Sequence, residues 1–121
     1  PQQVTTIVSE ALSGRYNGQN TRFQLRVDGG PKIATAVQAR ISYDFQGDGN
    51  WDRVETWRYF PNDPVVGWEN YRDTQGLASS SGSWADFQNG KVKVELWSAL
   101  GNDPTQVELG SGSQLQLPFS P

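Results

Sequence analysis

Residues 41–60 read I-S-Y-D-F-Q-G-D-G-N-W-D-R-V-E-T-W-R-Y-F, and this stretch decides the fold class. Ile41, Tyr43 and Phe45 alternate with polar residues, which is the period of a strand with one apolar and one polar face. The segment 46–50 is rich in Gly, Asp and Asn, which accept the backbone conformations of tight hairpin turns. A second extended segment follows at 51–60. The stretch therefore predicts two antiparallel strands joined by a short acidic tip.

The same alternation recurs along the chain. Apolar and polar side chains alternate at 23–28, 91–96 and 115–119, and weaker strands are expected at 4–9 and 105–109. The segment 62–83 is rich in Gly, Pro and Ser and is expected to be mainly loop. No useful length of sequence has the period of a helix. We therefore predict an all-β chain, an antiparallel β-sandwich of immunoglobulin-like or jelly-roll-like type, with about 7–9 strands.

Composition narrows the function classes. The chain has 121 residues, which suits a single domain spanning 1–121, and its net charge is −3. Its 10 Lys and Arg are scattered, so neither nucleic acid nor an anionic membrane is expected as a partner. The chain contains no Cys and no His, which excludes disulfides, thiolate zinc sites and His-dependent nucleophiles.

The ends of the chain also carry an expectation. No apolar run is long enough for a transmembrane helix, and no signal peptide is visible. The chain begins at Pro1 without Met, so we expect a mature protein or a module excised from a larger one.

The acidic stretch 44–55 has the oxygen spacing of a calcium-binding loop. Its candidate ligands are Asp44, Gln46, Asp48, Asn50, Asp52 and Glu55. Gln46 is a neutral replacement for the usual Asp or Asn, and the flanking segments are strands rather than the helices of an EF-hand. Two interpretations stay open, a plain hairpin turn and the same turn braced by structural Ca²⁺. In both, the role is structural and no cofactor is required for function.

Aromatic rings fall on the polar sides of the expected strands. Trp97 shares a strand face with Lys93 and Glu95, whereas Trp57 and Tyr59 share one with Arg53 and Glu55. Exposed indole rings beside carboxylates suit a sugar, because the C–H face of a pyranose packs on a ring and its hydroxyls form hydrogen bonds. For each ring, core packing is the alternative. The candidate carbohydrate contacts are Trp57, Tyr59, Trp68, Trp97 and Glu55.

Residues 43–60, Gly67-Trp68-Glu69, 90–97 and 115–119 resemble a known group. They are similar to the non-catalytic β-sandwich modules of secreted microbial glucanases, and most similar to the family 56 carbohydrate-binding modules. The resemblance covers residues 23 to 119. It implies a secreted module that binds β-1,3-glucan, such as curdlan or laminarin, and holds a tethered catalytic domain on insoluble polysaccharide. We expect it to act as a monomer without catalysis.

Two other functions stay open. One is a calcium-stabilised extracellular adhesion or structural domain with a protein partner, since protein interfaces also enrich Trp and Tyr. The other is a small glycoside hydrolase, with paired carboxylates at Asp48 and Asp52 or at Glu69 and Glu95. Short loops and the small size of the domain disfavour the deep cleft that a hydrolase needs.

Overall fold

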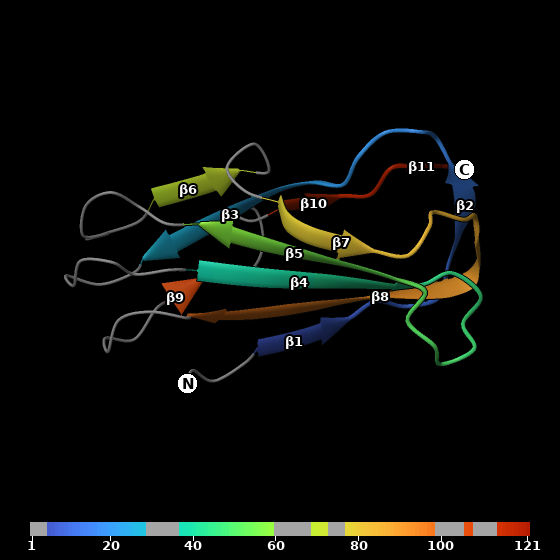
Figure 1. The fold of residues 1–121 in the computed structure, drawn as a ribbon, viewed down its shortest axis with the longest axis horizontal. Coiled ribbons are helices and arrows are strands. Elements are labelled where there is room, and N and C mark those ends of the chain that lie inside the picture. The colour runs from blue at the N-terminus through green and yellow to red at the C-terminus, as the bar shows by residue number, and fades with distance from the viewer. Residues whose placement is uncertain (1–4, 29–36, 60–68, 73–76, 99–105, 108–113) are drawn as a thin grey trace.

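The structure, a computed structural model, describes residues 5–28, 37–59, 69–72, 77–98, 106–107 and 114–121 (Figure 1). These residues contain eleven β-strands and no helix: β1 (Thr5–Val8), β2 (Leu12–Tyr16), β3 (Arg22–Asp28), β4 (Val37–Asp44), β5 (Arg53–Tyr59), β6 (Glu69–Arg72), β7 (Leu77–Ser81), β8 (Phe87–Ser98), β9 (Gln106–Val107), β10 (Gln114–Gln116) and β11 (Phe119–Ser120). Within these ranges, there is no helix long and apolar enough to cross a membrane. The all-β prediction is confirmed, and the strands outnumber those expected.

The strands pair in two antiparallel sheets. The seven-stranded sheet has the order β11-β2-β8-β4-β5-β7, with β1 also paired to β8. The four-stranded sheet has the order β10-β3-β6, with β9 also paired to β3. Two sheets are what a sandwich requires, but most side chains of the smaller sheet lie outside the described residues. How the sheets pack face to face therefore stays a prediction.

The predicted hairpin is formed by β4 and β5. Their register runs from Tyr43 opposite Arg53 to Val37 opposite Tyr59, and the Asp52 amide donates to the Tyr43 carbonyl at 2.7 Å. Gly47 at the tip has a φ of 66°, and a Cβ there would lie 2.2 Å from a backbone carbonyl oxygen. Glycine is required at this position both by conformation and by space.

The core lies on one face of the seven-stranded sheet. Its buried members are each at most 5% exposed: Ala39, Ile41, Tyr43, Phe45, Trp57, Phe87, Val92 and Leu96. Further rings close the end of the core near the hairpin tip. The ring centroids of Phe87 and Phe119 lie 4.3 Å apart, and Tyr16 stacks on Trp84 at 4.8 Å with an interplanar angle of 9°. The alternating apolar positions of β4 and β8 thus form the core, as their period indicates.

Some element boundaries differ from those expected. The segment 62–83 contains two strands, β6 and β7, and β7 forms from a Ser-rich run because it pairs with β5. The C-terminal run splits at Pro118 into β10 and β11. These pair with β3 and β2, which belong to different sheets. The split follows because proline has no N–H to donate to a strand ladder.

Candidate functional site

The seven-stranded sheet places the predicted site residues on two opposite faces. Across β4, Trp57 of β5 pairs with Ala39, and Trp97 of β8 pairs with Gln38. Successive residues of a strand point to opposite faces, so Trp57 and Trp97 lie on opposite sides of one sheet. The face of Ala39 is the core. We call the other one the outer face, and Trp97 belongs to it.

Trp57 and Glu55 are therefore not available as sugar contacts, and that part of the sequence prediction is wrong. Their exposed fractions are 5% and 2%. The alternation that grouped them on one face with Arg53 is correct, but that face packs into the core. The Tyr59 side chain and the whole of Trp68 lie outside the described residues, so their predicted sugar contacts stay predictions.

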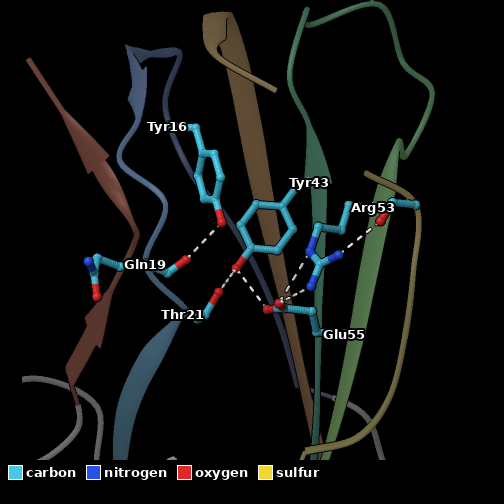
Figure 2. A network of polar contacts seen from close by, with 7 residues as sticks. Tyr16, Gln19, Thr21, Tyr43, Arg53 and Glu55 are labelled. Atoms are coloured by element: carbon cyan, nitrogen blue, oxygen red, sulfur yellow. Dashed lines mark hydrogen bonds and ion pairs between the residues drawn. The ribbon is translucent and has the colours of Figure 1, made fainter. Parts of the chain in front are cut away.

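Glu55 belongs to a buried polar network (Figure 2). The Tyr43 hydroxyl donates to Glu55 Oε1 at 3.0 Å, and Arg53 Nη2 donates to Glu55 Oε2 at 2.9 Å. The Thr21 hydroxyl bonds the Tyr43 oxygen, and it must be the donor because the one Tyr43 hydrogen goes to Glu55. Burial, with the Glu55 charge second, raises the pKa of Tyr43 above its ordinary value, so the phenol keeps its proton and remains a donor.

The network joins several parts of the fold. Arg53 Nη1 donates to the Gly82 carbonyl at 2.8 Å, and its guanidinium lies 4.2 Å from the Trp84 ring centroid. Thr21 immediately precedes β3, so its bond to Tyr43 links the start of the smaller sheet to β4. A buried carboxylate that is paired and hydrogen-bonded in this way has a structural role.

The outer face carries a row of three charged side chains with an indole ring at each end. Glu95 lies at its centre and accepts hydrogen bonds from Arg40 Nε and Nη2 at 2.9 and 3.0 Å. Lys93 Nζ lies 3.7 Å from the same carboxylate. Arg40 lies 5.8 Å from the Trp97 ring centroid, and Lys93 lies 4.7 Å from that of Trp51. We call these five residues, in the order Trp51, Lys93, Glu95, Arg40 and Trp97, the outer row.

The strand ladder assembles the outer row. Arg40 and Glu95 are directly opposite each other in β4 and β8, and Lys93 and Trp97 lie two residues to either side of Glu95. The hydrogen bond between Arg40 and Glu95 raises the pKa of Arg40 and lowers that of Glu95, so both stay charged over a wide pH range. Contacts between cations and rings, worth about 0.5–1 kcal/mol at exposed sites, hold both indoles in place.

Sequence reasoning found Trp97 but missed two members of the row. Trp51 lies in the turn before β5, where strand alternation assigns no face, and it is 38% exposed. Arg40 lies on another strand, and only its register with Glu95 brings it to Trp97. Next to the row, Arg58 Nε donates to Gln38 Oε1 at 2.9 Å, which adds polar groups beside Trp97.

The hairpin tip gathers three carboxylates. One oxygen from each of Asp44, Asp48 and Asp52 lies within 4.8 Å of the others. Asp44 accepts bonds from the amides of Asp48 at 3.2 Å and Gly49 at 2.9 Å, and Asp52 Oδ2 accepts one from the Phe45 amide at 3.0 Å. Burial alone would raise the pKa of Asp44, but the backbone hydrogen bonds outweigh burial and lower it.

The tip matches the predicted calcium site only in part. Three carboxylate oxygens suit a hard cation. Glu55 does not join them, because its carboxylate is held in the core by Tyr43 and Arg53. Gln46 and Asn50 are exposed at the tip, and the Asn50 amide donates to Asp48 Oδ1 at 2.9 Å. The hairpin interpretation accounts for these bonds without an ion, and Ca²⁺ at the three Asp residues stays a prediction.

Comparison of the chain with protein-family models, with curated proteins and with solved structures finds no match. The function is therefore inferred from the chemistry of the outer row.

Proposed function

We propose that the chain is a non-catalytic carbohydrate-binding module that binds neutral polysaccharide, with β-1,3-glucan as the preferred ligand, through the outer row. The observation that carries this proposal is the presence of two partly exposed indoles at the two ends of a line of three charged side chains. Two aromatic platforms of about 1–2 kcal/mol each give about 2–4 kcal/mol, which with hydrogen bonds between them corresponds to affinities of roughly mM.

The charges of the row favour a hydroxyl-rich neutral ligand over an ion. Glu95 is bound to both cations of the row, Arg40 and Lys93, so the row offers hydrogen-bond donors and acceptors side by side and carries a net charge of only +1. The choice of β-1,3-glucan comes from the resemblance in residues 43–60 and 90–97. Four of the five members of the row, all except Arg40, lie within those segments.

The row favours binding over hydrolysis. A glycosidase needs one carboxyl group whose pKa is raised so that it can donate a proton. Glu95 has a lowered pKa because Arg40 hydrogen-bonds to it, which is the opposite of this requirement. We accordingly propose a secreted, monomeric accessory domain that raises the effective concentration of a linked glycoside hydrolase at the polymer. A protein-binding adhesion domain is the competing function.

Trp97→Ala is expected to weaken binding to curdlan about tenfold or more, with an almost unchanged melting temperature, because it removes a platform and little core. Retention on curdlan, cellulose and chitin is the measurement. Lys91→Ala, on the same strand and face but outside the row, is the matched control and should bind like the wild type. Wild-type protein that is retained on none of these polymers would exclude glycan binding. Unchanged retention of the Trp97 variant would place the site elsewhere.

For the tip, we propose a structural Ca²⁺ held by Asp44, Asp48 and Asp52. Three adjacent carboxylates repel one another, so millimolar Ca²⁺ should raise the melting temperature, and EDTA should reverse the rise. Asp48→Asn removes one ligand charge but keeps the amide bonds to Asp44, and it should reduce the response. The same melting curve with Ca²⁺ and with EDTA would leave the tip as a plain turn.

A further inference from the structure

We propose that the ligand lies lengthwise along β8 and engages both Trp51 and Trp97, so that the protein recognises an internal stretch of an extended glycan chain rather than a single sugar or a chain end. This inference rests on the proposed function. It specifies the length of the ligand, its direction along β8 and the part of the glycan chain that is bound.

The separation of the two platforms comes from the strand itself. Lys93 and Trp97 are four residues apart on β8, which is about 13 Å at the usual rise of about 3.3 Å per residue. The Trp51 ring contacts the ammonium of Lys93, the residue at one end of this interval, and Trp97 is the residue at the other end. One pyranose ring is too short to cover both indoles. Only an oligosaccharide laid along the strand can do so.

The middle of the row has a different chemistry from its ends. Between the rings lie Glu95, Arg40 and Lys93, which offer carboxylate, guanidinium and ammonium groups. A sugar unit at this position would be held by hydrogen bonds to its hydroxyls, and the units on either side would stack on indole. Charge-assisted hydrogen bonds of this kind are stronger and more directional than neutral ones. The row thus provides a stacking, a polar and a second stacking position in series.

The side chains on either side of the middle of the row are mostly small. At the level of Glu95, the neighbours across the sheet are Thr6 on β1 on one side and Arg40 on the other. Beyond Arg40 come Thr56 on β5 and Ser79 on β7. Thr6, Thr56 and Ser79 are small, so among the described residues no bulky side chain outside the row stands beside it at this level. Small side chains beside the middle of the row suit an extended chain laid along β8, whereas recognition of a chain end needs a closed pocket.

The two rings are also coupled through Glu95. Arg40 and Lys93 each contact one indole, and both are bound to the same carboxylate. The platforms are therefore pre-positioned relative to each other, which lowers the entropy lost when a long ligand engages both. Binding at the second ring then occurs at a high effective concentration.

The test is a series of β-1,3-gluco-oligosaccharides of increasing length, from the disaccharide to laminarin, titrated by calorimetry. We expect the wild-type affinity to rise steeply once the chain is long enough to reach both rings and then to level off. Trp51→Ala and Trp97→Ala should each weaken the longest ligand about tenfold. Each should also remove most of the length dependence, because only one platform remains. Reduction of the reducing end of a long oligosaccharide should leave its affinity unchanged.

Three outcomes would overturn this inference while leaving glycan binding intact: a wild-type affinity that is independent of length, a Trp51→Ala variant that binds the longest ligand like the wild type, and loss of affinity on reducing the chain end. Absence of binding to every oligosaccharide and to the polymer would instead exclude the proposed function. Trp51→Tyr, which keeps a ring, should retain the length dependence. A melting temperature of Trp51→Tyr close to that of the wild type would show that the hairpin tip still folds.

Discussion

Glu55→Ala is expected to lower the free energy of unfolding by about 3–5 kcal/mol, because it removes one partner of a buried ion pair and leaves the other uncompensated. The side chains of Arg53 and Glu55 are only 12% and 3% exposed. Without the carboxylate, the Arg53 charge and the Tyr43 hydroxyl both lose their shared acceptor. Equilibrium unfolding in urea measures the loss directly.

Glu95→Ala is the matched control for this prediction. Glu95 is also a strand carboxylate paired with an arginine, and its side chain is 13% exposed, but the Arg40 side chain is 46% exposed. Arg40 can be solvated when the carboxylate is removed, so the control should cost clearly less stability than Glu55→Ala. Similar losses of unfolding free energy in Glu55→Ala and Glu95→Ala would contradict the assignment of Glu55 to the core. Glu55→Gln, which keeps part of the hydrogen bonding, should fall between the wild type and Glu55→Ala.

Trp57→Ala is expected to cost about 3–5 kcal/mol of stability, the range for large aromatic truncations in a core. Trp57 packs among the buried residues on the inner side of β5. The cost combines the lost transfer free energy of the indole with the cavity left behind it. Thermal and urea unfolding of the purified variant are the measurements.

Trp97→Ala, in the same sheet, provides the comparison. Trp57 of β5 and Trp97 of β8 pair with the adjacent residues Ala39 and Gln38 of β4, so they lie at a similar level of the sheet but on opposite faces. Trp57→Ala should reduce stability, and it should affect glucan binding only through unfolding. Trp97→Ala should reduce binding and leave the melting temperature almost unchanged. A large loss of stability from Trp97→Ala would show that the outer face is covered in the folded protein.

Much of the fold follows from local patterns. The alternation at 41–45 and 91–96 and the Gly-rich turn at 46–50 predict β4, the hairpin and β8, because strand period and turn conformation are properties of neighbouring residues. The strands β2, β6 and β7 escaped this reasoning. Gly14 lies within β2, and β7 contains a run of Ser. Such residues favour a strand weakly on their own, and partner strands hold them in place.

The candidate site was harder to predict than the fold. The core face of β5 carries Arg53 and Glu55, which resemble surface residues in the sequence. Their burial is possible because they pair with each other, the Tyr43 hydroxyl donates to Glu55, and the Gly82 carbonyl accepts from Arg53. With charged residues on both sides of the strand, alternation could group side chains correctly and still not tell which group faced solvent. The burial of Glu55 and Trp57 depends on partners that are distant in the sequence.

By itself, the sequence determined the all-β class, the acidic hairpin and the grouping of Trp97 with Lys93 and Glu95, because these depend on residues within a few positions of one another. Tertiary structure alone decided that Trp57 is core and that Arg40 and Trp51 complete the outer row. Arg40 meets Glu95 across 55 positions of sequence through the register of β4 and β8. That register is set by the packing of the whole sheet, which no local pattern encodes.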